Sequence, residues 1–305
     1  MLQKTEFIWF DGKLVPWDQA QVHVLAHGLH YGTGVFEGIR AYACPDGSSA
    51  VFRLPEHSKR LVNSAKILGI NMPYTADEIS RRSSKPLGPT SFPKATSVPS
   101  PLPAKATWAC SRQQPHARHH RRVALGRLLG AEASKGHPHQ DQLLRPYARQ
   151  HPDEQGQGRR QLCEPVLAKM EVKQDGYDEA LMLDTNGYVC EATGENFFIV
   201  RNGVIKTPPL TAILDGITRD SIIKIARDLG YIVEEQLFTR DEVYYADEAF
   251  FSGTAAELTP IRELDNRTIG EGHAGPVTKA LQAAYFKAIK GQDPRYGHWL
   301  TNYKF

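Results

Sequence analysis

The chain has 305 residues, of which 41% are hydrophobic and 23% charged, and its formal net charge is +3. This length suits one large domain or two ordinary ones, and the apolar fraction suffices for a packed core. The sequence lacks an apolar run long enough for a membrane span and the start pattern of a signal peptide. Its four cysteines lack the spacing of a disulfide framework or a zinc site. We therefore expect a soluble cytoplasmic protein.

The small positive charge is an average over two different compositions. Residues 81–165 contain 15 Lys and Arg against 5 Asp and Glu, together with 11 of the 20 prolines. The rest of the chain holds 22 basic and 29 acidic residues and is therefore mildly acidic. We expect three parts: an ordered N-terminal domain at 1–80, an anomalous segment at 81–165, and a C-terminal domain at 166–305.

Both outer parts show the patterns of ordered secondary structure. Asp11-Gly12 between two apolar runs predicts a hairpin, and a strand near residue 52 leads into a helix that starts at Pro55. After the window, alternating runs predict an antiparallel meander over 179–184, 188–191, 196–200 and 203–206. Helices are predicted at 221–229, 240–243 and 276–290, with a buried strand at 248–251. The pattern indicates a mixed α+β fold without βαβ periodicity.

Two loops rich in small residues are candidate anion sites, at 216–218 and 252–257. Backbone N–H groups at a helix N-terminus favour an anion such as phosphate. For either loop alone, an ordinary helix cap is the favoured interpretation. Arg60 and Glu191, taken alone, are typical of solvated surface charges. Residues 31–40 are rich in glycine, with Gly32, Gly34 and Gly38, but lack the spacing of a phosphate loop.

Four motifs in order resemble the branched-chain amino-acid aminotransferases, which are pyridoxal-phosphate (PLP) enzymes of fold type IV. They are His-Tyr-Gly-Thr-Gly-Val-Phe-Glu-Gly-Ile-Arg at 30–40, Glu-Ala-Thr-Gly-Glu-Asn-Phe-Phe at 191–198, Gly-Ile-Thr-Arg-Asp at 216–220, and Ala-Asp-Glu-Ala-Phe-Phe-Ser-Gly-Thr-Ala-Ala-Glu at 246–257. The resemblance covers about 1–80 and 166–305. It implies a small N-terminal α/β domain, a larger C-terminal domain of pseudo-barrel character, and a homodimer or larger homo-oligomer.

The resemblance also implies roles for single residues. Arg60, the amides of Ile217 and Thr218, and Thr254 would hold the PLP phosphate. Glu191 would hydrogen-bond the pyridine nitrogen, so that the ring acts as an electron sink.

The substrate side of the site is implied in the same way. Tyr31 and Phe36 would line the pocket for an aliphatic side chain, and the amides of Thr254 and Ala255 would bind the substrate carboxylate. Arg40 is placed near the same site. The implied reaction moves the amino group of Leu, Ile or Val to 2-oxoglutarate. We expect the protein to bind no nucleic acid, membrane or metal ion.

The lysine that should form the Schiff base with PLP is missing. The family carries it in a Lys-Ala-x-Gly-x-Tyr motif that would fall near position 157, where this chain has Gln157. Lys169 lies about a dozen residues further on; we interpret it as an exposed residue of the following helix, so no catalytic lysine is assigned. We expect the written chain to be inactive and poorly folded between 81 and 165.

A shifted reading frame would explain both the missing lysine and the odd composition. Residues 157–165 can be encoded so that a shifted frame reads Lys-Ala-Ala-Gly-Asn-Tyr-Val-Asn, and residues 94–100 so that one reads Gly-Tyr-Ile-Arg-Pro-Leu. Both resemble family motifs at their expected places. Three alternatives stay open: a PLP-binding pseudoenzyme without turnover, a protein whose basic segment binds a partner such as nucleic acid, and an enzyme like aminodeoxychorismate lyase.

Overall fold

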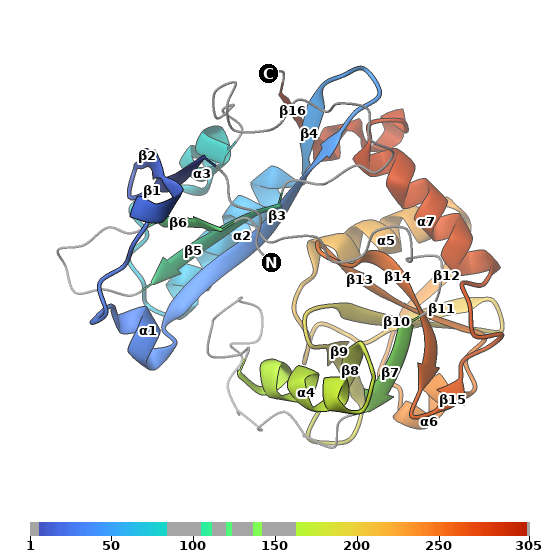
Figure 1. Ribbon diagram of the computed structural model, residues 1–305. Coiled ribbons are helices and arrows are strands. Elements are labelled where there is room, and N and C mark those ends of the chain that lie inside the picture. The colour runs from blue at the N-terminus through green and yellow to red at the C-terminus, as the bar shows by residue number, and fades with distance from the viewer. Residues whose placement is uncertain (1–5, 84–104, 112–119, 124–136, 142–162, 304–305) are drawn as a thin grey trace. The chain divides into compact units, whose positions relative to one another are not determined.

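The computed structural model describes residues 6–83, 105–111, 120–123, 137–141 and 163–303. The chain divides into two compact units (Figure 1). Unit 1 comprises residues 1–127, 156–160 and 287–305, and unit 2 comprises 128–155 and 161–286. The basic window at 81–165 is thus shared between the units. No helix in the described ranges is long and apolar enough to cross a membrane.

Unit 1 is built on an antiparallel sheet with the strand order β16-β4-β3-β5-β6-β1-β2. Its strands are β1 (Phe7–Phe10), β2 (Lys13–Pro16), β3 (Gly34–Ala43), β4 (Ser49–Phe52), β5 (Lys105–Ser111), β6 (His120–Val123) and β16 (Leu300–Tyr303). Its helices are α1 (His27–Tyr31), α2 (Leu54–Ile67) and α3 (Ala76–Ser83), with short 3-10 helices at Trp17–Gln19 and Pro294–Trp299. The predicted hairpin is confirmed: β1 and β2 join through Asp11 and Gly12, both with positive φ.

The core of unit 1 lies between α2 and β3, which run side by side (Figure 1). On the face of β3 that carries α2, the residues Val35, Glu37 and Ile39 are buried. From α2, Leu61 and Ala65 pack into the same cluster. The helix begins as expected, with proline in its first turn, where a missing N–H costs no hydrogen bond.

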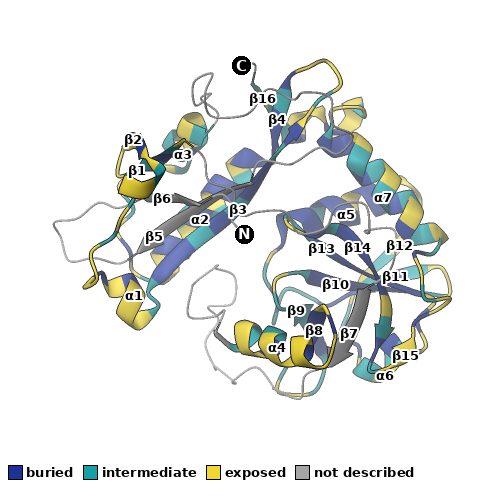
Figure 2. Ribbon diagram, viewed as in Figure 1, coloured by how far each residue is buried: buried dark blue, intermediate teal, exposed yellow. Residues whose placement is uncertain are grey.

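Unit 2 contains the longer run of strands and the more deeply buried core (Figure 2). Its strands are β7 (His137–Asp141), β8 (Glu179–Leu183), β9 (Val189–Ala192), β10 (Asn196–Arg201), β11 (Val204–Thr207), β12 (Ile232–Glu235), β13 (Glu248–Gly253), β14 (Glu257–Leu264) and β15 (Arg267–Thr268). Its helices are α4 (Cys163–Gln174), α5 (Ile217–Asp228), α6 (Arg240–Tyr244) and α7 (Pro276–Ile289), whose last residues belong to unit 1.

The strands of unit 2 form a closed circuit. β10 pairs with β13, and the pairing then runs through β14, β7, β8 and β9 back to β10. The closing pair is Asn196 opposite Glu191. Large apolar side chains such as Phe197 and Phe251 fill the core on one side of these strands. This closed sheet is the barrel-like domain that the resemblance implies.

Three sequence expectations need comment. The antiparallel meander is confirmed, since β8, β9, β10 and β11 pair in that order. The mixed α+β class is confirmed, and within it β11 and β12 are parallel neighbours joined through α5, a crossover that does not by itself make a repeating βαβ pattern. In addition, α5 begins at Ile217 rather than residue 221. Its polar first turn hid the start, because Arg219 is buried there against Pro208 O and Glu235.

The structure describes only parts of the window at 81–165, so the expectation that this segment is poorly folded stays a prediction. Three of its described stretches are strands, and they pair with both sheets: β5 with β3, β6 with β5, and β7 with β14 and β8. A strand edge offers unpaired N–H and C=O groups, and the backbone of any residue except proline can both donate to them and accept from them. Sheet pairing therefore reaches into the window despite its unusual composition.

Candidate active site

In unit 2, the carboxylate of Glu191 is held by two N–H donors at the end of β9. Its Oε2 accepts a hydrogen bond from the Leu214 amide at 3.1 Å and from Asn196 Nδ2 at 3.2 Å. Asn196 Nδ2 also donates to the Leu214 carbonyl at 3.0 Å. Because both donors sit on one oxygen, the side chain of Glu191 has a fixed direction. The loop that ends in α5 is bound to the same carboxylate.

The N-terminus of α5 is the second part of the site. Gly216 is its N-cap in an extended conformation, and no side chain caps the helix. The first amides of a helix, here those of Ile217 and Thr218, have no intrahelical carbonyl partner and attract anions. A Cβ on Gly216 would lie 1.8 Å from Asn196 Oδ1, so glycine is required for this close approach.

The turn between β13 and β14 carries Thr254 and Ala255. It packs on the turn after Glu191, because the Cβ position of Gly253 lies 3.5 Å from Gly194 O and from the Glu195 Cγ. Ser252, one residue earlier, pairs directly with Asn196 across the two strands. Both candidate loops, at 216–218 and 252–257, and the carboxylate of Glu191 therefore lie at one end of the closed sheet. The residues here fit a ligand with a protonated ring nitrogen and an anionic arm.

In unit 1, Arg60 is tied to a buried carboxylate. Its Nε donates to Glu37 Oε1 at 2.6 Å and its Nη2 to Glu37 Oε2 at 2.9 Å. His57 Nδ1 lies 2.7 Å from Glu37 Oε2, and both Glu37 and His57 are buried. Burial opposes ionisation of Glu37, but the Arg60 guanidinium and the His57 hydrogen bond outweigh it and lower the pKa of this carboxyl. Burial lowers the pKa of His57 despite Glu37, so His57 is a neutral donor through Nδ1–H.

The candidate substrate residues of unit 1 fall on two elements. Phe36 and Arg40 lie on the face of β3 opposite Glu37, since residues two and four apart on a strand share a face. Arg40 is buried, with its guanidinium 5.3 Å from the centre of the Tyr42 ring. Tyr31 ends α1 and is 62% exposed. The structure thus groups Phe36 with Arg40 and keeps Arg60 on the other side of the strand.

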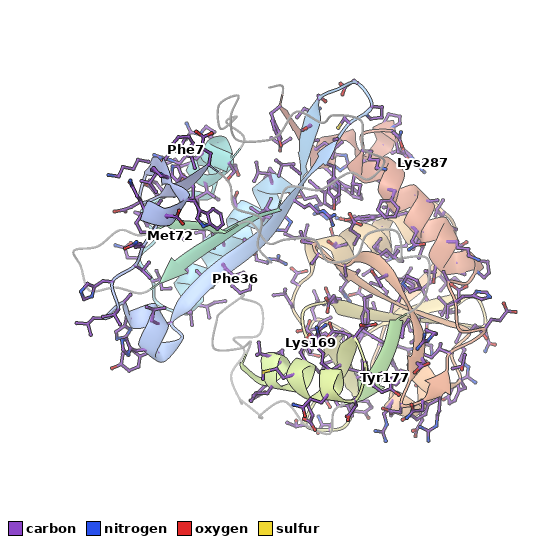
Figure 3. All side chains as sticks on the ribbon, viewed as in Figure 1. Phe7, Phe36, Met72, Lys169, Tyr177 and Lys287 are labelled. Atoms are coloured by element: carbon purple, nitrogen blue, oxygen red, sulfur yellow. The ribbon has the colours of Figure 1, made fainter. Side chains whose placement is uncertain are left out.

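Lys169 is not the exposed residue expected from the sequence. It lies on α4, as expected (Figure 3), but its side chain is only 32% exposed, and Nζ pairs with Oε2 of the buried Glu179. The hydroxyl of Thr193 donates to the other oxygen of Glu179. Burial and the charge of Glu179 raise the pKa of Glu195 to about 8. The buried carboxylate attracts the ammonium inward, which an apolar pattern on a helix does not reveal.

Sequence reasoning missed two residues of these networks. Asn196 stands in the quoted motif at 191–198, yet its link to Glu191 depends on strand pairing. His57 lies on α2, one turn before Arg60. The signal in the sequence is this spacing of three residues, which places the two side chains on the same face of the helix. Gln157 and the segment at 94–100 lie outside the described residues.

Comparison with known proteins decides the family. The profile described as "Amino-transferase class IV" matches residues 34–264, which include Arg40, Arg60, Glu191 and both candidate loops. The chain belongs to the class IV aminotransferase family. The cofactor of this family is pyridoxal phosphate. The matched range, residues 34–264, includes the whole window at 81–165 as well as parts of the N-terminal and C-terminal domains.

Full-length relatives agree with the family. A branched-chain-amino-acid aminotransferase of Pseudomonas aeruginosa is 41% identical, with 99% of this chain and 98% of the relative covered. The crystal structure of the Escherichia coli branched-chain amino acid aminotransferase has a TM-score of 0.88 at 36% identity, covering 97% of this chain and 99% of that one. The PLP form of the enzyme from Thermobaculum terrenum has a TM-score of 0.89 at 30% identity, covering 99% of both. The fold is therefore fold type IV.

Proposed function

We propose that the chain derives from a branched-chain amino-acid transaminase, which moves the amino group of Leu, Ile or Val to 2-oxoglutarate. The observation that carries this is similarity over the whole length, at 41% and 39% identity, to aminotransferases of that name from Pseudomonas aeruginosa and Escherichia coli. The enzyme would use pyridoxal phosphate, which acts as an electron sink for the amino-acid carbon when bound. Because these similar proteins are named as aminotransferases, a lyase that acts on a different substrate is the weaker candidate.

The geometry of unit 2 supports the cofactor assignment. The fixed carboxylate of Glu191 suits a protonated ring nitrogen, and the amides of Ile217 and Thr218 suit a phosphate. Thr254 would add a hydroxyl to the phosphate side. Arg60, oriented by Glu37, would supply a charge-assisted contact to the same phosphate.

The substrate would be held by two backbone amides and by side chains of unit 1, and Thr254 would serve both the cofactor and the substrate. The amides of Thr254 and Ala255 would bind its carboxylate, and Phe36 would contact its aliphatic side chain. Tyr31 would cover the same side chain and Arg40 would lie beside it. Because Tyr31 is exposed within its own unit, we place its contribution in a homodimer.

The written chain has no lysine at position 157, and we propose that it has no transaminase activity. A proton carrier and covalent anchor is required there, and Gln157 can serve as neither. Nearly complete coverage of both chains, at nearly equal length, supports a shifted reading frame. An added basic insert would lengthen the chain, whereas the window replaces residues that the relatives also have.

The test compares two proteins. One is the written chain, and the other carries the two motifs restored at 94–100 and 157–165 by correction of the frame. With leucine, 2-oxoglutarate and PLP, the restored chain is expected to form glutamate and the 2-oxo acid, while the written chain forms neither. In a separate assay with aminodeoxychorismate as the substrate, pyruvate release by a restored chain that forms no glutamate from leucine would favour the lyase alternative. Turnover by the written chain would overturn the role of the missing lysine.

A further inference from the structure

Glu191, Asn196 and Ser252 form a row across three neighbouring strands. Asn196 of β10 is directly opposite Glu191 of β9 on one side and Ser252 of β13 on the other. Directly opposed residues of antiparallel strands lie on one face, with their Cβ atoms about 5 Å apart. Asn196 is 5% exposed and therefore sits in the interior of the site rather than at its rim.

Both amide hydrogens of Asn196 are used in hydrogen bonds. Nδ2 has two hydrogens, and it donates one bond to Glu191 Oε2 at 3.2 Å and one to Leu214 O at 3.0 Å. The Leu214 amide donates back to the same Glu191 oxygen at 3.1 Å. One side chain thus joins a strand-end carboxylate to the loop that delivers α5.

The oxygen of the same amide lies against Gly216, where α5 starts. Asn196 Oδ1 occupies the place that a side chain on Gly216 would take, at 1.8 Å from the ideal Cβ. Gly216 is the N-cap residue, immediately before the amides of Ile217 and Thr218. A change at Asn196 would therefore move the carboxylate and the helix N-terminus together.

We propose that Asn196 is a positioning residue that couples the carboxylate for the ring nitrogen to the helix N-terminus for the phosphate. It sets the distance between the two groups that a single ligand must satisfy at once. Loss of the amide would weaken the two contacts jointly rather than one of them. This inference rests on the proposed function, because it takes PLP as the ligand.

The test measures binding without turnover, with the full written chain. PLP is titrated by quenching of tryptophan fluorescence, and inorganic phosphate is titrated as its competitor. Asn196→Asp replaces the amide donor by a second carboxylate beside Glu191. Asn196→Ser shortens the side chain, so that it no longer reaches Glu191 and Leu214, and adds no charge. Asn186→Asp, an identical change on the exposed β8–β9 turn, is the matched control.

Loss of a hydrogen bond to a charged group is expected to weaken PLP binding about tenfold or more in both Asn196 variants. Phosphate binding should weaken as well, while Asn186→Asp stays within about twofold of the parent. Glu191→Gln should weaken PLP but leave phosphate unchanged, and its effect should not add to that of Asn196→Ser.

The outcomes separate the two proposals. A parent chain that does not bind PLP overturns the cofactor assignment itself. A parent that binds PLP while both Asn196 variants bind it equally well overturns only the coupling. Additive losses in Asn196→Ser and Glu191→Gln, with a lower melting temperature, would mean a merely structural asparagine and would also overturn the coupling.

Discussion

Arg60 and Glu37 form a two-point ion pair inside unit 1, with both oxygens of the carboxylate engaged at 2.6 and 2.9 Å. Paired N–H groups on a carboxylate fix the plane of the guanidinium as well as its position. Glu37 lies on β3 and Arg60 on α2, so the pair also joins the sheet to its covering helix. The orientation of Arg60 is therefore a property of the core and not of a surface side chain.

Substitution of Glu37 should cost much more than substitution of an exposed carboxylate. Glu37→Gln removes the buried charge that pairs with the partly buried Arg60, and we expect the free energy of unfolding to fall by about 3–5 kcal/mol. Glu56→Gln on the same helix changes a carboxylate that is 39% exposed and pairs with Arg53, and it should cost less than the change at the buried Glu37, about 1 kcal/mol. Urea denaturation measures both, and equal losses would contradict the buried-pair assignment.

The free energy of unfolding should change with pH because of Glu195. Its pKa in the folded protein, about 8, lies above the ordinary value of 4.5. The folded state therefore holds the proton more tightly, so this stabilisation is complete below pH 4.5 and is lost as the pH rises to 8.

Glu195→Gln keeps the neutral form at all pH values. At pH 8.5 it should raise stability by about 1 kcal/mol or more, equivalent to 2–4 °C in melting temperature for a protein of this size. At pH 5 the difference should vanish. Stability curves of Glu195→Gln and the parent that run parallel from pH 5 to pH 8.5 would refute the assignment.

Gly216 should not tolerate a methyl group. Gly216→Ala places a Cβ against Asn196 Oδ1, and overpacking of this kind costs about 1–3 kcal/mol. Gly194→Ala, on the turn after β9, meets nothing within 4 Å and should change stability by about 0.5 kcal/mol or less. Thermal unfolding of the two variants separates the outcomes, and an equally stable Gly216→Ala would mean that the loop is free to move away.

Lys169 should prove structural. Lys169→Met leaves the buried carboxylate of Glu179 without its ammonium, and we expect a loss of about 1–3 kcal/mol. Lys173→Met on the same helix, where the side chain is exposed, should be nearly neutral. Borohydride reduction with PLP followed by peptide mapping should find no adduct on Lys169, and an adduct there would give it the anchoring role we assign to the missing lysine.

The sequence predicts those features that depend on neighbouring residues. The Asp11-Gly12 turn and the proline at the start of α2 are local, and both were predictable. The partners of Glu191 were not, because Asn196 meets it only through the register of β9 and β10, and Leu214 arrives from a loop. Glu37 likewise pairs with a residue on a different element, so its buried charge network follows from packing and not from a motif.

Sequencing the source DNA across the codons for residues 81–165 is the most direct measurement. We predict small insertions or deletions whose correction places lysine at position 157 and the Tyr-Ile-Arg-Pro stretch near 94–100. DNA that encodes the segment as written, through both motifs, would contradict the shifted frame. The protein would then be a class IV aminotransferase homologue without the family's lysine.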